Sequence, residues 1–223
     1  MKIALAGNPN SGKTTLFNAI TGKSEYVGNW PGVTIAKKEA DAKKKYNPEG
    51  IKVRIVDLPG TYSISPFTGE EAITRDFILD EEPDVIINIV DGANISRSLF
   101  FTTQLLELGI PLVIALNKSD IVSKRGDILN QEALSKILNC NIIATTATSE
   151  EGLKKLMNEA IRLGREKKPQ IAPDFPGKNS DDPDRARQNY VDEIVQKCLV
   201  KKRDATKLTF SDKVDRIVAH KWL

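Results

Sequence analysis

Cysteine and histidine are scarce in this chain of 223 residues, and their scarcity argues against several kinds of site. The two cysteines, Cys140 and Cys198, lack the spacing of a zinc site or of a disulfide framework. The single histidine, His220, has no neighbouring partner that would make it a metal ligand. We therefore expect both cysteines to be ordinary thiols in a reducing compartment.

Long hydrophobic runs are also missing. No apolar stretch reaches the roughly 18–20 residues that cross a bilayer, and no signal peptide precedes the first strand-like run. The net charge is only +3, which is too small to predict a nucleic-acid partner, although basic residues cluster at 37–38, 43–45 and 201–203. Taken alone, the polypeptide is expected to be soluble and cytoplasmic, with no nucleic acid bound.

What is present is the pattern of an α/β domain with a sizeable core, since 40% of the residues are hydrophobic. Strand-like and helix-like segments alternate to about residue 167. This alternation predicts a mostly parallel six-stranded sheet with an antiparallel edge strand and helices on both faces. The expected strands are 3–6, 51–56, 85–90, 112–116 and 141–145, with 33–45 paired to 51–56 as the antiparallel edge. The expected helices are 96–108, 131–138 and 152–165.

The composition changes after this domain. Five residues that interrupt regular structure lie close together: Pro169, Pro173, Pro176, Gly177 and Pro183. We predict a first domain at 1–167, a linker at 168–183 and a small helical appendage at 184–223. Within the appendage, helical spacing covers 184–202 and then a last stretch that opens at 209 or 211.

Residues 7–14 carry the phosphate-binding loop of the P-loop proteins, between a predicted strand and a predicted helix. Gly7 and Gly12 let the backbone approach phosphate groups, and the N–H groups of the loop then point at anionic oxygens. Lys13 supplies a positive charge to the β- and γ-phosphates, and the Thr14 hydroxyl is a candidate Mg²⁺ ligand. The expected nucleotide-binding residues here are Gly7, Asn8, Pro9, Asn10, Ser11, Gly12, Lys13, Thr14 and Thr15.

A second motif, Asn117-Lys118-Ser119-Asp120, follows a predicted buried strand and predicts guanine as the base. The Asp120 carboxylate can accept two hydrogen bonds from guanine, whereas adenine would leave this charge unpaired. Lys118 is expected to lie along the base plane, and Asn117 to tie this motif to the phosphate loop. A further base-contacting loop is expected at Thr146, Ala147 and Thr148.

Two segments have the pattern of switches that respond to the γ-phosphate. Asp57 is expected in the Mg²⁺ shell, the Gly60 N–H on the γ-phosphate, and Thr34 as the second hydroxyl ligand of Mg²⁺. Thr61 stands where many small GTPases have a water-orienting glutamine, so intrinsic hydrolysis is expected to be slow. The switch residues are Gly28, Asn29, Trp30, Pro31, Gly32, Val33 and Thr34 in one segment and Asp57, Leu58, Pro59 and Gly60 in the other.

Together these motifs resemble the cytosolic G domain of ferrous iron transport protein B, a family of TRAFAC-class P-loop GTPases. The resemblance rests on 7–15, 28–34, 57–63 and 117–120, and the Asn-Trp-Pro-Gly-Val-Thr segment is its most specific part. It runs continuously over 1–167 and returns at 184–223, where 210–222 resembles the segment before the family's first membrane helix.

The resemblance implies a GTP-binding and GTP-hydrolysing domain of a prokaryotic Fe²⁺ transporter, whose nucleotide-dependent switch loops regulate iron uptake. It implies a position at the cytoplasmic face of the inner membrane and a transmembrane partner domain that this chain does not contain. The implied cofactors are Mg²⁺ and K⁺, with slow, K⁺-stimulated hydrolysis. The implied K⁺ ligands are Asn10, Gly28 and Trp30, and the expected catalytic residues are Lys13, Asn10, Thr34 and Gly60.

The C-terminal region departs from the family pattern, because the linker leaves room for one or two helices instead of the usual helical bundle. Two other functions compete with that of a transporter domain. A stand-alone GTPase of ribosome assembly would need an RNA-binding domain after residue 170, and no Gly-x-x-Gly loop is present there. A module that holds nucleotide without turnover is compatible with Thr61. The pattern leaves open whether the chain forms a homo-oligomer.

Overall fold

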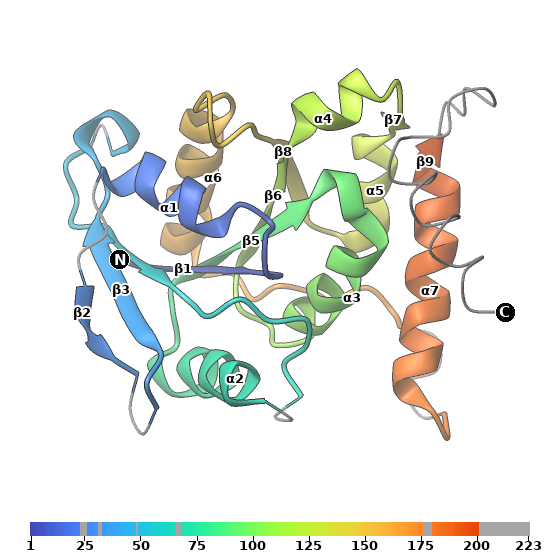
Figure 1. Cartoon of the computed structure of the whole chain (residues 1–223), viewed down its shortest axis with the longest axis horizontal. Helices are drawn as coiled ribbons and strands as arrows, with labels where there is room; N and C mark the ends of the chain where they lie inside the picture. The colour runs from blue at the N-terminus through green and yellow to red at the C-terminus, as the bar shows by residue number, and fades with distance from the viewer. Residues whose placement is uncertain (23–25, 31–32, 48, 66–67, 176–179, 201–223) are drawn as a thin grey trace, which may run out of the picture.

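The fold was analysed in a computed structural model, which describes residues 1–22, 26–30, 33–47, 49–65, 68–175 and 180–200. Figure 1 shows one central sheet with helices on both sides and α7 along one flank. Over these residues, no helix combines the length and the hydropathy needed to cross a membrane.

The sheet has seven strands in the order β2-β3-β4-β1-β5-β6-β8. Five of them, from β4 to β8, run parallel, whereas β3 is antiparallel to both β4 and β2. The predicted α/β class and antiparallel edge are therefore confirmed, but the count of six was wrong. The extra strand, β2, overlaps the start of the first switch segment and covers the edge expected for β3. The strands are β1 (Lys2–Gly7), β2 (Tyr26–Asn29), β3 (Ala36–Asp41), β4 (Arg54–Asp57), β5 (Val85–Asp91), β6 (Leu112–Asn117) and β8 (Asn141–Ala144).

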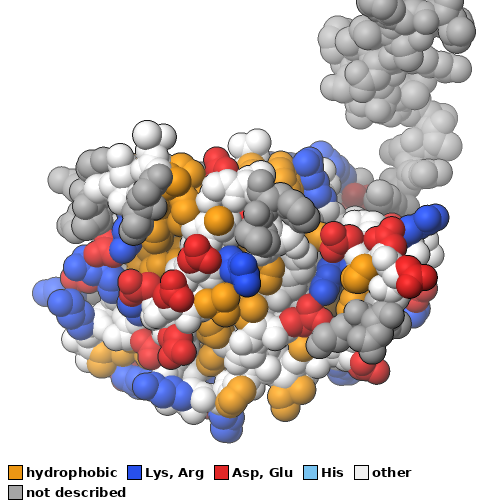
Figure 2. Space-filling view, turned by 90° about the horizontal axis from the view of Figure 1, so that it is seen from below, with side chains coloured by type: hydrophobic (Ala, Val, Ile, Leu, Met, Phe, Trp, Pro, Cys, Tyr) orange, Lys and Arg blue, Asp and Glu red, His pale blue; other side chains and the backbone are white. Residues whose placement is uncertain are grey.

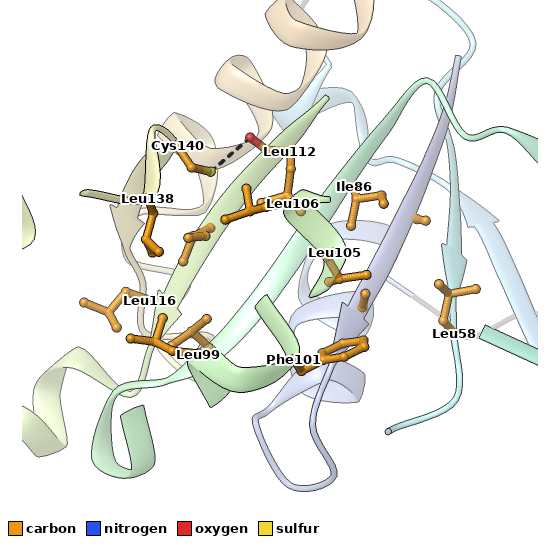
Figure 3. Close-up of a cluster of buried hydrophobic side chains, with 14 of the residues drawn as sticks. Leu58, Ile86, Leu99, Phe101, Leu105, Leu106, Leu112, Leu116, Leu138 and Cys140 are labelled. Carbon is orange, nitrogen blue, oxygen red and sulfur yellow. Dashed lines mark hydrogen bonds between the residues drawn. The ribbon is translucent and has the colours of Figure 1, made fainter. Parts of the chain in front are cut away.

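Helices cover both faces because the central strands are apolar on both sides. In β1, Ile3 and Leu5 join one hydrophobic cluster, while Ala4 and Ala6 join the other. The first cluster packs under α1 and α6, and the second under α2, α3, α5 and α7. Figure 3 shows the second cluster between the sheet and α3. The helices are α1 (Lys13–Thr21), α2 (Gly69–Glu81), α3 (Ile95–Leu106), α4 (Ser119–Lys124), α5 (Gln131–Leu138), α6 (Leu153–Glu166) and α7 (Pro183–Cys198).

The cysteines are both free and buried. The Cys140 thiol donates to the Leu112 carbonyl at 3.3 Å, as Figure 3 shows, and burial raises its pKa to about 12. This thiol therefore stays protonated at neutral pH and acts as a small core side chain.

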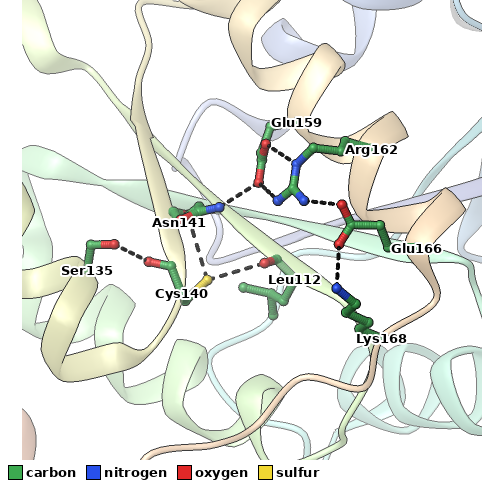
Figure 4. A network of polar contacts seen from close by, with 8 residues as sticks. All are labelled: Leu112, Ser135, Cys140, Asn141, Glu159, Arg162, Glu166 and Lys168. Atoms are coloured by element: carbon green, nitrogen blue, oxygen red, sulfur yellow. Dashed lines mark hydrogen bonds and ion pairs between the residues drawn. The ribbon is translucent and has the colours of Figure 1, made fainter.

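Polar contacts join α6 to β8, the last strand of the sheet. The Glu159 carboxylate accepts from the Asn141 side chain at 2.5 Å and from Arg162 at 2.7 Å (Figure 4). Arg162 also pairs with Glu166 along the same helix. The charged surface elsewhere is mixed, since Figure 2 shows acidic and basic side chains interspersed on the face it views.

After residue 167, the structure differs from the prediction at both ends of α7. Pro183, which was assigned to the linker, is the first residue of α7, where its fixed φ suits a helix start, and Asp182 caps it by accepting from the Arg185 N–H. The helix predicted for 184–202 was wrong at its C-terminal end. It stops at Cys198, and β9 (Leu199–Val200) pairs antiparallel with β7 (Ile128–Leu129).

The described part of the appendage packs directly on the first domain. Val191, Ile194 and Cys198 of α7 lie in the same hydrophobic cluster as Leu99 of α3 and Leu138 of α5. The domain boundaries at 167 and 183 remain predictions. Residues 176–179 of the linker and the tail 201–223 lie outside the described residues.

Truncating the α7 face should test this packing. Ile194→Ala is expected to lower the free energy of unfolding by about 2–4 kcal/mol, because Ile194 is 2% exposed and its removal leaves a cavity against α3 and α5. Urea denaturation checks this, with exposed Gln196→Ala on the same helix as the control. Equal stability of the two variants would contradict the docking of α7.

Candidate functional site

The phosphate loop lies at the carboxyl end of β1, in the centre of the sheet, where α/β proteins bind ligands. A Cβ at Gly7 would meet the Ile89 carbonyl at 2.7 Å, and one at Gly12 would meet the Asn117 side chain at 2.2 Å. Gly12 also has a φ of +94°, which favours glycine. Both glycines are thus required by the protein's own packing, in addition to any ligand.

A cleft of about 680 Å³ opens above this loop. Its lining includes Asn10, Lys13 and Thr14 of the phosphate loop, Gly60 of the second switch and Lys118 of the base motif. Three motifs that are far apart in sequence therefore meet at one place. No side chain caps the N-terminus of α1, so no capping side chain occupies the N–H groups of its first turn, which lies at the cleft.

Lys13, which lines the cleft, forms an ion pair of 2.5 Å with Asp57, and their side chains are 10% and 7% exposed. Each residue was predicted to meet a ligand, the lysine an anion and the aspartate a cation shell. In this structure each charge neutralises the other. Such a pair is costly to break on one side only, since that would leave a buried charge alone.

Asn117 joins the base motif to two other loops. Its side-chain amide donates to the Ser11 carbonyl at 2.9 Å, as the sequence predicted, and its side-chain oxygen accepts the Ala147 N–H at 3.1 Å. Ser119 adds a second link, because its hydroxyl donates to the Thr145 carbonyl at 3.0 Å. The predicted base loop at 146–148 is therefore attached to both the base motif and the phosphate loop.

Lys118 is held in place by a residue that the sequence analysis missed. Its ammonium donates to the Asn10 carbonyl at 2.8 Å and to the Asp91 carboxylate at 2.9 Å. Burial alone would raise the pKa of Asp91, but hydrogen bonds from Lys118 and Asn94 bring that pKa below its usual value. A signal for Asp91 was available, because it ends a buried strand beside the one that ends at Asn117.

Asp120 lies in the first turn of α4, with 37% of its side chain exposed. Its contact with Lys124, at 3.4 Å, is on the surface. The carboxylate is thus accessible to a ligand. The other predicted residues of the base loop differ in exposure, since Thr146 and Ala147 are buried and Thr148 is exposed.

In the first switch segment, Trp30 and Val33 pack into the core and Thr34 lies at the surface. Trp30 is buried and makes an edge-to-face contact with Phe77 of α2, with ring centroids 5.4 Å apart. Thr34 is exposed, and among the described residues the cleft is lined at this segment by Ile35. The structure therefore does not bring Thr34 to Thr14 and Asp57. Gly28 lies in β2, Asn29 ends that strand, Val33 packs against the core, and Pro31 and Gly32 lie outside the described residues.

Several other predicted residues have structural partners. The Asn8 amide donates to the Arg97 carbonyl at 3.1 Å, which ties the phosphate loop to α3, while Leu58 is a core residue. Thr61 is 3% exposed, and its hydroxyl donates to the Ser63 carbonyl at 2.7 Å. The Thr61 side chain is therefore hydrogen-bonded to a residue close by in the sequence. Pro9, Thr15 and Pro59 line the cleft, as does Glu70 at the start of α2, which the sequence analysis missed.

Comparison with known proteins places this architecture in a family. The family model described as ferrous iron transport protein B matches residues 1–160. The Fe(2+) transporter FeoB of Escherichia coli K12 is 44% identical over 160 residues, covering 70% of this chain and 20% of the relative. A fusion protein of Fe(2+) transport protein A and FeoB from Porphyromonas gingivalis is 42% identical over 170 residues, covering 75% of this chain and 20% of its own length.

Solved structures agree with this assignment. The cytosolic domain of L. pneumophila FeoB superposes with a TM-score of 0.80 at 28% identity, covering 90% of this chain and 100% of that one. The T. maritima FeoB cytosolic domain in GMPPNP form has a TM-score of 0.81 at 26% identity, with 90% and 100% covered. A GDP-bound point mutant of the S. thermophilus FeoB G-domain has a TM-score of 0.73 at 33% identity, with 100% and 90% covered. The chain belongs to the ferrous iron transport protein B family, of which it carries the N-terminal domain.

Proposed function

We propose that this chain binds GTP and GDP and hydrolyses GTP, as the cytosolic nucleotide-binding domain of a ferrous iron transporter. The observation that carries the proposal is the cleft in which the phosphate loop, Gly60 and Lys118 converge. Solved relatives bound to GDP or in GMPPNP form support it, since they share the fold. Family membership argues against the stand-alone ribosome-assembly GTPase.

The phosphates would be held at the uncapped start of α1. There the loop N–H groups and the helix dipole favour an anion, and Lys13 exchanges Asp57 for a phosphate oxygen. This exchange leaves the Asp57 carboxylate available to a cation. Nucleotide and cation are thus expected to bind together, because either alone would separate the Lys13–Asp57 pair without replacing both partners.

The donor set fits Mg²⁺, which prefers oxygen ligands. Thr14 is exposed and lines the cleft, and Asp57 supplies a carboxylate that is paired with the adjacent Lys13, whereas Thr34 would have to move inward from its exposed position. When bound, Mg²⁺ neutralises charge on the β- and γ-phosphates. Closure of the first switch is proposed to consist of this inward movement of Thr34.

Asp120 would select guanine. Its accessible carboxylate can pair with the two adjacent donors of the base, while Lys118, fixed by Asp91 and Asn10, lies beside it. Asn117 keeps the base motif in register with the phosphate loop through Ser11. A bound nucleotide would therefore meet a preformed base site and a switch that still has to close.

Hydrolysis is proposed to be slow and K⁺-stimulated. Thr61 is engaged with Ser63 and is not available to orient water, so the chain needs another source of transition-state stabilisation. Asn10 is exposed and lines the cleft, with a φ of +64°. Its backbone carbonyl accepts from Lys118, whereas its side-chain oxygen makes no hydrogen bond within the described part of the chain and could bind a cation. Gly28 and Trp30 are proposed as backbone K⁺ ligands after the first switch closes.

The role in iron transport is a proposal at the level of the whole protein, because the chain spans about a fifth of the length of its curated relatives. We propose that its partner is a transmembrane portion, and that it works at the cytoplasmic face of the membrane. Nucleotide-dependent movement of the switch segments would then regulate iron uptake.

Replacing Asp120 by Asn is expected to weaken GDP binding about 100-fold or more and to favour xanthine nucleotides, because the amide cannot accept both guanine donors. Calorimetry with GDP and XDP in magnesium buffer measures this. Lys124→Ala, which removes only the surface partner of Asp120, is the matched control and should bind GDP normally. An unchanged base preference in Asp120→Asn would remove the base assignment.

Single-turnover hydrolysis in KCl should be at least about tenfold faster than in NaCl, in keeping with a cation that replaces part of an arginine finger. Asn10→Gly should abolish this difference while GDP affinity stays near that of the parent, since glycine keeps the positive φ without the amide. Equal and negligible rates in both salts would defeat the K⁺-dependent enzyme.

A further inference from the structure

The loop between β8 and α6 is held in a strained backbone conformation. Glu150 has a φ of +60° and Gly152 a φ of +75°, and a Cβ at Gly152 would meet the Ala144 carbonyl at 2.1 Å. A non-glycine residue such as Glu150 occupies this region at a cost, so the surrounding contacts must hold it there. Contacts made by the Glu150 side chain are therefore expected to help hold this conformation.

The strained part is coupled to the residues that meet the base site. The Thr146 N–H donates to the Glu151 carbonyl at 3.1 Å, and the Ser149 N–H donates to the Thr146 carbonyl at 3.1 Å. Ala147 in turn donates its N–H to the Asn117 side chain. A change of backbone at Glu150 would thus shift the hydrogen bonds that place Thr146 and Ala147.

The ends of the loop are already rigid. Asn141 of β8 and Glu159 of α6 are hydrogen-bonded, and Glu159 pairs with Arg162, as Figure 4 shows. Leu153 and Leu156 at the start of α6 are fully buried. The ends of the loop are thus anchored to β8 and to the core, and Glu150 lies between these anchors.

The contact that holds this middle part comes from a distant segment, η1 (Lys44–Tyr46), between β3 and β4. The Tyr46 hydroxyl donates to the Glu150 carboxylate at 2.7 Å, and the Lys45 ammonium pairs with the same oxygen. The hydrogen bond from Lys45, followed by that from Tyr46, lowers the pKa of Glu150, so the carboxylate is ionised at neutral pH. The contact is thus charge-assisted.

The position of Tyr46 suits a fixed anchor. Its ring is 4% exposed and packs in the cluster under α1 and α6, which leaves the hydroxyl directed at Glu150. The preceding Lys43 donates its N–H to the Ile20 carbonyl and its ammonium to the Ala19 carbonyl. The same short segment therefore also binds the last turn of α1, the helix that begins at the phosphate loop.

We propose that Tyr46 and Glu150 are positioning residues that hold the base-contacting loop in the observed conformation and so set how long a guanine nucleotide stays bound. This inference rests on the proposed nucleotide binding. Neither side chain lines the cleft, so both act through Thr146 and Ala147. The Tyr46 ring packs in the core, whereas its hydroxyl makes the contact with Glu150, so removing the hydroxyl alone tests the contact without removing the packing.

The test uses stopped-flow release of a fluorescent GDP analogue from the 223-residue chain. Tyr46→Phe keeps the ring and loses the hydroxyl, and it should release nucleotide about three- to tenfold faster with an unchanged association rate. Glu150→Ala should do the same. Because both changes break the Tyr46–Glu150 contact, and Glu150→Ala also removes the pair with Lys45, the double variant should release no faster than Glu150→Ala alone, whereas independent effects would multiply.

Arg165→Gln provides the matched control. It breaks the ion pair between Arg165 of α6 and Glu49, which lies just after η1. Neither residue belongs to the base-contacting loop, so nucleotide release should be unchanged. Equal release from the parent and from both single variants would overturn the role of the contact while leaving nucleotide binding intact. Multiplicative effects in the double variant would also overturn it. Failure of the parent itself to bind the analogue would instead overturn the proposed function and the inference together.

Discussion

Asn117 makes the contact on which the geometry of the site is built. One side-chain amide binds the Ser11 carbonyl of the phosphate loop and the Ala147 N–H of the loop after β8. It does so from the end of β6, a fully buried strand that cannot shift without disturbing the core. The absence of a Cβ at Gly12 permits this approach. Three loops separated by many residues are in this way held at fixed distances around the cleft.

Opposite charges prepare the same cleft for a charged ligand. Lys13 is paired with Asp57 and Lys118 with Asp91, so each of the two lysines that line the cleft has an acidic partner. A ligand with both anionic groups and an associated cation can replace the first pair on both sides. The Lys118–Asp91 pair can persist, because its role is to orient the lysine stem. Under the proposed function, the first pair would exchange on binding and the second would remain.

The first switch shows how tertiary packing competes with ligand contacts. Its Trp30 is inserted against Phe77 of α2, and the strands before and after Trp30, β2 and β3, pair at the sheet edge. Burial of two aromatic rings stabilises this arrangement. Thr34 consequently stays at the surface, and an ordered triphosphate would have to offset the packing to bring it inward. The two switches are linked in space through α2, which begins after the second one.

Local patterns in the chain were enough to predict the fold class, the phosphate loop, the base motif and helices such as α5, because these depend on residue spacing and on strand burial. They also predicted the Asn117–Ser11 link. They did not reveal Asp91, Glu70, the Tyr46–Glu150 contact, the seventh strand or the end of α7 at Cys198. Each of these depends on which distant residue lies opposite, and that is settled only when the elements pack together. Residue spacing specifies backbone conformation, whereas a side chain's partner is set by how the packed elements meet.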